Sequence, residues 1–168
     1  QPDPYRGVLF IGLMIDEHGD PYVVEFNVRF GDPECQVTLP LVATDMYDLL
    51  HGAATDRLRD VALEVHDSVA LTVVLASEGY PASPIKGRPI DGLSEVLDGE
   101  AYGRAWVNFA GVALGDEGQY IASGGRVLSC TAQSDDLTSA HDAAYELLQH
   151  LSLEGGHHRR DIGHRAME

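Results

Sequence analysis

The segment VVEFNVRFGDPE, residues 23–34, passes from an apolar strand pattern to a helix-start pattern. Side chains alternate between the faces of a strand, so Glu25, Asn27 and Arg29 are expected on one face together with Val23. The opposite face would be apolar, with Tyr22, Val24, Phe26 and Val28. Polar groups on a strand that otherwise reads as buried are costly unless they are paired or coordinate something. The pattern leaves two interpretations open: a Glu25–Arg29 ion pair or solvated strand face, and a functional site.

The functional interpretation rests on the chemistry of these three side chains. Glu25 and Asn27 both present oxygen, roughly 6–7 Å apart between Cα atoms on one strand face. Mg²⁺ prefers oxygen ligands and takes only a few from the protein, sharing its shell with phosphates and water. Arg29 carries a planar guanidinium that suits a phosphate or a carboxylate. The segment therefore favours phosphoryl transfer from a nucleotide.

A helix is expected directly after this strand. Asp32 suits the N-cap, Pro33 the first helical position and Glu34 the first turn. The free N–H groups of such a helix would favour an anion. Pro40 should interrupt this helix, and a second helix is expected from about Asp45 to Leu58.

Upstream, residues 7–15 read as a strand that pairs with residues 22–29 through the acidic turn 16–20. A domain boundary is expected between residues 63 and 64, where the composition changes. Beyond it the chain is strand-rich with one clear helix after Asp136, which predicts an α+β module. The expected strands are residues 68–76, 95–97, 105–109, 119–122 and 126–132.

The composition excludes some function classes. Eleven Lys and Arg stand against 27 Asp and Glu, giving a formal charge of −16. This balance argues against nonspecific nucleic-acid binding and against an anionic membrane surface. No apolar run reaches the length of a membrane span. Cys35 and Cys130 lack metal-ligand spacing and are expected to be reduced and buried, in a cytoplasmic protein. Because the chain starts at Gln1 without an initiator Met, we expect it to begin within a longer protein or to be processed.

Five ordered blocks of the sequence resemble the phosphoribosylamine–glycine ligase family of ATP-grasp enzymes, and the resemblance covers essentially the whole chain. The blocks are residues 7–15 with 24–34, residues 71–77 with Gly79-Tyr80-Pro81, Lys86-Gly87, residues 124–128, and residues 159–166.

The resemblance implies the C-terminal part of an ATP-grasp module in residues 1–63 and the small C-terminal α+β domain of the ligase in residues 64–168. It also implies a reaction in which ATP, glycine and 5-phosphoribosylamine give ADP, phosphate and glycinamide ribonucleotide through glycyl phosphate. The glycine-rich ATP loop and the phosphate-binding lysines of the family are absent from these 168 residues. We therefore expect a fragment that is inactive alone and needs the N-terminal part of the same enzyme.

The family pattern implies Mg²⁺ or Mn²⁺ on Glu25 and Asn27, which would also contact ATP, and a catalytic role for Arg29. Three further positions have two readings each. Asp32 is an N-cap or part of the substrate site, and Lys86 belongs to a simple turn or to a loop near the phosphoribosylamine pocket. Arg126 is a surface arginine of a hairpin turn or a contact of a substrate phosphate.

The sequence leaves the roles of two further segments undecided. Arg159 and Arg160 contact other domains or substrate, or belong to a solvated terminal segment. Where the family usually reads Phe-His-Ala-Gly-Thr, residues 108–112 read NFAGV, so that Phe109 and Val112 replace the His and the Thr.

Two rival functions remain on the sequence. One is another ATP-grasp carboxylate–amine ligase, which a product assay with glycine and phosphoribosylamine would separate. The other is a non-catalytic module that only binds a partner chain.

Overall fold

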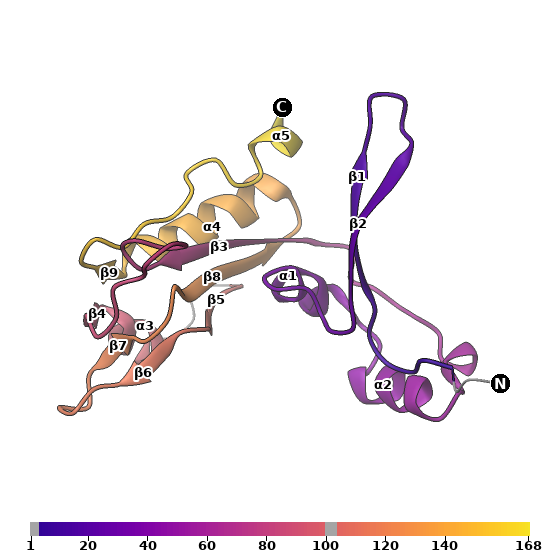
Figure 1. The fold of residues 1–168 in the computed structure, drawn as a ribbon, viewed down its shortest axis with the longest axis horizontal. Helices are drawn as coiled ribbons and strands as arrows, with labels where there is room; N and C mark the ends of the chain where they lie inside the picture. Colours follow the sequence, from indigo (N-terminus) through magenta and orange to yellow (C-terminus); the bar gives the residue numbers. More distant parts are fainter. Residues whose placement is uncertain (1–3, 100–103) are drawn as a thin grey trace. The chain divides into compact units, whose positions relative to one another are not determined.

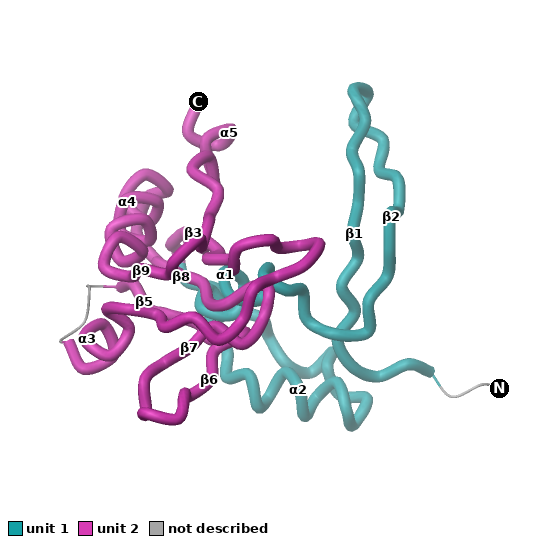
Figure 2. The backbone as a smooth tube through the Cα atoms, turned by 60° about the vertical axis from the view of Figure 1, so that its left-hand side comes forward, with its two compact units in different colours: residues 1–66 teal, residues 67–168 magenta. Residues whose placement is uncertain are grey.

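The structure, a computed structural model, describes residues 4–99 and 104–168. The chain divides into two compact units, residues 1–66 and residues 67–168, coloured separately in Figure 2. Each unit has its own secondary structure, and each is described by itself below.

Unit 1 begins with an antiparallel hairpin of β1 (Phe10–Ile15) and β2 (Pro21–Asn27), as the sequence predicts. The acidic turn closes it: the Asp16 carboxylate accepts the backbone N–H groups of His18 at 2.8 Å and Asp20 at 3.0 Å. Both strands are shorter than expected. Phe10 pairs with Asn27 as the last rung, so the ladder ends before Val28.

The expectation that this strand is buried is wrong for unit 1. Val24, Phe26 and Met14 are 66%, 62% and 63% exposed. Among the described residues of unit 1, only Gly31 and Gly52 are buried. A two-stranded hairpin has no second layer to cover its faces, so apolar side chains on both sides stay in solvent.

The helix expected from Pro33 begins two residues later and is brief. It comprises α1 (Cys35–Thr38), whose N-cap is Glu34, and the 3₁₀ turn η1 (Leu39–Leu41) around Pro40. Asp32, Pro33 and Glu34 form a turn in which the Gly31 carbonyl accepts the Cys35 N–H at 3.1 Å. The Asp32–Pro33 peptide is cis.

The second helix, α2 (Met46–Ala54), starts as expected: the Asp45 carboxylate accepts the Tyr47 N–H at 2.8 Å. It ends before Leu58, because the chain leaves the helix at Thr55, reaches a positive φ at Asp56 and continues into the 3₁₀ turn η2 (Leu58–Asp60). Gly52 is buried, and a Cβ there would lie 3.2 Å from the Leu58 Cα, so a small residue is needed where η2 meets α2.

Unit 2 is built on a three-stranded antiparallel sheet with the order β3 (Val69–Ala76), β8 (Arg126–Ser134), β5 (Ala105–Phe109). Helix α4 (Leu137–Gln149) packs along this sheet (Figure 1). Its N-cap is Asp136, whose carboxylate accepts the Ser139 N–H at 2.9 Å, in agreement with the predicted cap.

The core of unit 2 lies between the sheet and α4. Alternate residues of β3 (Leu71, Val73 and Leu75) are buried, as period-2 patterning requires. They cluster with the buried α4 side chains Ala140, Ala144, Leu147 and Leu148, which have helical spacing. This core fixes the register of β8 and thereby the position of Arg126 at the start of that strand.

Shorter elements complete unit 2: β4 (Ile90–Asp91) pairs with β9 (Ser152–Leu153), and β6 (Val112–Leu114) with β7 (Tyr120–Ala122). The chain ends in α5 (His164–Met167).

The strand expected over residues 95–97 is wrong, because this segment is helix α3 (Leu93–Asp98). Gly92 takes a positive φ of 81° and its carbonyl accepts the Val96 N–H at 3.0 Å. Leu93 is fully buried, and Val96, three residues on, packs against the same core.

The structure also bears on the two cysteines and on the absence of an apolar run of membrane-spanning length. Both cysteines are free; Cys130 is buried and Cys35 is half-buried. Burial raises the pKa of the Cys130 thiol to about 12. In the described part of the chain, none of the helices has the length and apolar character that crossing a membrane requires.

Candidate functional site

The hairpin places Glu25 and Asn27 on one face of β2, as the sequence predicts. Glu25 pairs with Gly12 and Asn27 pairs with Phe10. Val23 does not share this face, because Val24 is an extra residue in the ladder between the Gly12–Glu25 and Leu13–Val23 pairs. Neighbouring residues of β1 point to opposite sides, so this bulge sends Val23 and Glu25 to opposite faces.

Gly12 makes room for the Glu25 side chain. A Cβ on residue 12 would lie 3.1 Å from the Glu25 Cγ and 3.8 Å from its Oε1. The carboxylate therefore lies across the strand partner rather than pointing away from it. Among the described residues, it has neither a hydrogen bond nor an ion pair, so its oxygens are open to a ligand.

Asn27 presents an unsatisfied polar group at the end of β2. Among the described residues that are not exposed, its Nδ2 is the one buried side-chain N or O atom that lacks a hydrogen-bond partner. A buried polar atom without a partner costs about 1–3 kcal/mol. A hydrogen-bond acceptor would satisfy this N–H₂ group, whereas a cation would take the Oδ1 of the same amide.

These two side chains fit a divalent cation that is shared with a phosphate. They supply carboxylate and amide oxygens, the donors that Mg²⁺ and Mn²⁺ take. No cluster of three or more His, Cys, Asp or Glu residues that could hold a metal occurs within residues 4–99 and 104–168.

Arg29 does not lie on the strand face where it is expected. The strand ends at Asn27, and Val28 and Arg29 form a bend. The guanidinium donates from Nη1 to the carbonyl of its neighbour Phe30 at 2.7 Å. Arg29 thus follows the two oxygen ligands along the chain but is oriented by a local backbone contact.

Asp32 is exposed, and it is not the N-cap of α1. That helix has four residues and no side-chain cap, so it does not supply the anion site that a longer helix would. The N-cap interpretation of Asp32 is therefore excluded.

In unit 2, the structure brings two of the sequence blocks together around Arg126. The Arg126 Nε donates to the Tyr80 hydroxyl at 3.0 Å. The Ser77 hydroxyl donates to the Gly124 carbonyl at 2.8 Å, and the Ser77 N–H donates to the Gly125 carbonyl at 2.8 Å. A Cβ on residue 125 would overlap the Tyr80 ring, so the Gly-Gly pair lets the Gly-Tyr-Pro loop approach.

Lys86 belongs to the same loop region but remains exposed, in contrast to its neighbour Arg88. Arg88 forms an ion pair with Glu78 and donates to the Glu154 carbonyl at 2.6 Å. Gly87 follows Lys86 with a positive φ of 87°, and its N–H donates to the Ala122 carbonyl at 2.7 Å. Lys86 is thus a charge on a loop that is anchored on both sides.

Sequence reasoning missed Tyr80 and Gly12 as individual contributors to these sites. Tyr80 was recognisable only as part of a turn, since its contact with Arg126 spans 46 positions. Gly12 in a strand signals a close approach, but the approaching side chain follows from the register alone.

Of the two terminal arginines, Arg159 is engaged within its own segment. Its Nε and Nη2 donate to the Asp161 carboxylate at 2.8 and 2.6 Å. This bidentate contact lowers the pKa of Asp161 to about 2 and raises the pKa of Arg159. Phe109, in the altered segment, packs edge-on to Tyr120 with ring centroids 5.8 Å apart.

Comparison with known proteins assigns two stretches of the chain to known domains. Residues 1–35 match the sequence profile described as "Phosphoribosylglycinamide synthetase, ATP-grasp (A) domain", which places the β1–β2 hairpin in the ATP-grasp class. Residues 70–165 match the profile "Phosphoribosylglycinamide synthetase, C domain". The chain belongs to the phosphoribosylglycinamide synthetase family, and the family resemblance of the sequence blocks is confirmed.

Individual relatives agree with this assignment. Phosphoribosylamine–glycine ligase of Rhizobium meliloti is 45% identical over 164 residues, which cover 98% of this chain and 37% of the relative. The enzyme of the same name from Mycobacterium tuberculosis is 47% identical over 165 residues, with 98% and 37% coverage. The crystal structure of phosphoribosylamine–glycine ligase from Thermotoga maritima superposes with a TM-score of 0.70 at 36% identity, covering 91% of this chain and 36% of that chain. The chain thus spans little more than a third of the length of these relatives.

Proposed function

We propose that the chain is the C-terminal part of a phosphoribosylamine–glycine ligase, which joins glycine to 5-phosphoribosylamine at the expense of ATP and releases glycinamide ribonucleotide, ADP and phosphate. The observation that carries this proposal is the 45–47% identity to enzymes of that name over 98% of the chain. The free cysteines are compatible with a cytoplasmic enzyme.

In this proposal Glu25 and Asn27 hold Mg²⁺ or Mn²⁺ between the enzyme and the phosphates of ATP. When bound, the cation offsets the negative charge that develops during phosphoryl transfer. Glu25 provides a carboxylate without a hydrogen bond or ion pair among the described residues, and Asn27 provides its amide oxygen, Oδ1. Both residues contribute by position and electrostatics, so the reaction requires no nucleophilic Ser or Cys.

Arg29 serves as the cation that stabilises the transferring phosphoryl group or the glycyl phosphate formed from it. In the structure, the Phe30 carbonyl accepts a hydrogen bond from the Arg29 Nη1. To bind the anion, the guanidinium must give up this hydrogen bond and donate to the anion instead. A charged acceptor forms the stronger hydrogen bond, which favours the exchange.

In unit 2, Arg126 and Lys86 are the proposed contacts of the phosphoribosylamine phosphate. Tyr80 supports this role for Arg126, because its hydroxyl orients the guanidinium through Nε. Asp32 is a proposed contact of the amine or ribose part of the substrate, since the N-cap role is excluded.

The N-terminal part of the same enzyme is the proposed partner of the exposed hairpin. Apolar side chains on both of its faces are solvent-exposed, among them Ile11, Leu13, Val24 and Phe26. Exposed apolar surface of this kind marks an interface. Most of the length of the relatives lies outside the matched region. The surface that covers the hairpin can therefore come from the same enzyme rather than from a different protein.

The proposal is tested by joining this chain to the remainder of the enzyme and measuring glycinamide ribonucleotide formed from glycine, phosphoribosylamine and ATP. Product formation by the complete enzyme, and none by the 168-residue chain, is expected. Product from another amine or carboxylate, but not from these two substrates, would point to a different ATP-grasp ligase. Turnover by the 168-residue chain alone would contradict the proposed dependence on the missing part.

A further inference from the structure

A groove on unit 2, separate from the residues of the proposed ligase site, lies between α4 and the terminal segment. It has a volume of about 380 Å³ and is lined by His141, Tyr145, Leu148, Gln149, Leu151, His158 and Arg160. Its size falls at the lower end of the range of small-molecule pockets.

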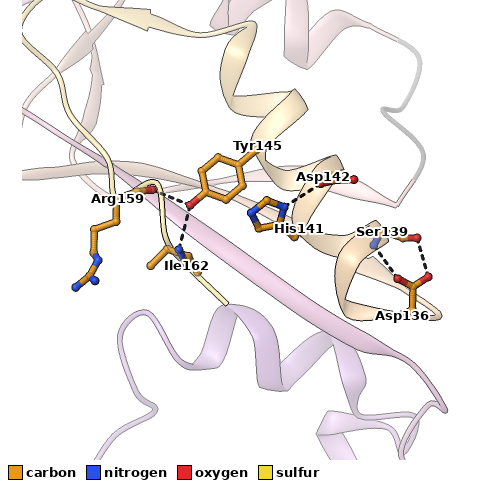
Figure 3. Close-up of polar contacts among 7 residues, drawn as sticks. All are labelled: Asp136, Ser139, His141, Asp142, Tyr145, Arg159 and Ile162. Carbon is orange, nitrogen blue, oxygen red and sulfur yellow. Dashed lines mark hydrogen bonds and ion pairs between the residues drawn. The ribbon is translucent and has the colours of Figure 1, made fainter. Parts of the chain in front are cut away.

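The walls of this groove are fixed by Tyr145. Its hydroxyl donates to the Arg159 carbonyl at 2.7 Å and accepts the Ile162 N–H at 3.3 Å (Figure 3). Ile162 packs against the core, and a Cβ on Gly163 would lie 2.9 Å from the Leu71 Cδ1. The terminal segment is therefore tied to both the helix and the core, and the groove is formed before any ligand binds.

Three aromatic rings converge there. The Tyr145 ring lies 4.5 Å from the His141 ring, tilted by 44°, and 6.2 Å from the His158 ring, at 60°. Figure 3 shows the His141 ring beside that of Tyr145 on successive turns of α4. Both centroid separations are within the range of aromatic contacts. Leu148 and Leu151 add apolar surface, so a flat ring finds stacking partners in the groove.

The groove also carries a positive charge without a counterion. Arg160 lines it and, among the described residues, makes no hydrogen bond or ion pair. The neighbouring Arg159 differs, because Asp161 occupies its guanidinium. Burial is the largest cause that lowers the pKa of His158, and the positive charges of Arg160 and His157 lower it further. The groove thus places a cation beside aromatic rings in a chain whose formal charge is −16.

We propose that this groove binds a mononucleotide, with the base stacked against Tyr145, His141 and His158 and the phosphate on the Arg160 guanidinium. A planar ring and an anionic group on one small molecule satisfy both features of the groove at once. Arg–phosphate pairs are among the stronger charge-assisted hydrogen bonds, and stacking of the base on aromatic side chains adds to the affinity. The proposal does not depend on the ligase activity, because none of the groove residues belongs to the proposed catalytic machinery.

The test is calorimetric titration of the 168-residue chain with AMP, adenosine, ribose 5-phosphate and inorganic phosphate. AMP should bind, and each of the other three should bind at least about tenfold more weakly, because each lacks one half of the recognition. Equal affinity for inorganic phosphate and AMP would overturn the stacking role. Absence of AMP binding at millimolar concentration would overturn the whole proposal.

A matched pair of variants locates the site. Arg160→Gln should weaken AMP binding at least about tenfold, whereas Arg159→Gln should change it less than about twofold. His141→Leu, which removes one ring but no fixed charge, should weaken AMP binding and leave phosphate binding unaltered. AMP binding that is indifferent to Arg160→Gln and His141→Leu, with folding verified by circular dichroism, would place the nucleotide elsewhere and contradict the proposal.

Discussion

Gly12 pairs directly with Glu25 in the β1–β2 hairpin, and the Glu25 Cγ lies 3.1 Å from the position that a Cβ on residue 12 would take. The absence of a side chain at one position thus sets the orientation of a carboxylate on the neighbouring strand. This relationship links a strand glycine to the proposed metal site.

Gly12→Ala should displace the Glu25 carboxylate, because the new Cβ would lie 3.1 Å from its Cγ. In the complete enzyme we expect Mn²⁺ affinity, measured by electron paramagnetic resonance, to fall about tenfold. Leu13→Ala is the control, since Leu13 is exposed and pairs with Val23 on the other face. Equal Mn²⁺ affinity of Gly12→Ala and the wild type would contradict the proposed coupling.

Leu147→Ala should destabilise unit 2, because Leu147 is fully buried between α4 and the sheet. The expected loss is about 2–5 kcal/mol in the free energy of unfolding, from lost transfer energy and the residual cavity. Leu114→Ala, at a position that is 66% exposed, should change it by less than about 0.5 kcal/mol. Urea unfolding followed by circular dichroism measures both, and similar losses would argue against the assigned core.

Asp161 should make the terminal segment sensitive to acid. The hydrogen bonds from Arg159 lower the folded-state pKa of Asp161 from 3.8 to about 2. The folded state therefore favours the charged carboxylate, and this contribution to stability is complete above pH 3.8 and is lost as the pH falls toward 2. Unfolding measured between pH 5 and pH 2 should show a smaller acid-dependent loss for Asp161→Asn. An identical pH dependence in wild type and variant would contradict this assignment.

The pKa of His158 should lie below that of an ordinary histidine, because burial, Arg160 and His157 all disfavour its protonated form. Arg160→Gln removes one of these causes and should raise the His158 pKa, read from its imidazole C2–H resonance by NMR. Arg159→Gln, whose guanidinium is held by Asp161, should have less effect. A larger shift in Arg159→Gln than in Arg160→Gln would place the charge of Arg160 away from the groove.

Local patterns predicted the elements whose signals are local. The Asp45 and Asp136 caps, strand β3 and helix α4 follow from capping residues and apolar period. The strand expected over residues 95–97 is part of helix α3, because the two apolar residues Val96 and Leu97 do not distinguish a strand from one turn of helix. The prediction of an N-cap at Asp32 is wrong for a similar reason, since Asp is a preferred N-cap residue but is also common in turns. Here residues 32–34 form a turn, in which the Gly31 carbonyl accepts the Cys35 N–H, and the helix starts after it.

The candidate site was predicted in part. Glu25 and Asn27 lie two residues apart on the same side of the bulge at Val24, so they share a face as predicted. Val23 lies on the other side of the bulge and faces the opposite way. A bulge depends on the partner strand, so β2 alone could not reveal it. The position of Arg29 also depends on the partner strand, because β1 begins at Phe10 and the ladder therefore ends at Asn27, before Arg29. The Tyr80–Arg126 contact depends on the tertiary fold of unit 2.

The central claim is that Glu25 and Asn27 hold the catalytic cation of a phosphoribosylamine–glycine ligase. Its most direct test is the rate of glycinamide ribonucleotide formation by the complete enzyme carrying Glu25→Gln or Asn27→Ala. Glu17→Gln serves as control, since Glu17 is an exposed carboxylate in the turn of the same hairpin. We predict that each site variant loses about a hundredfold or more in turnover, with an unchanged circular dichroism spectrum, while Glu17→Gln stays near wild type. Turnover of both site variants at the wild-type rate would contradict the account.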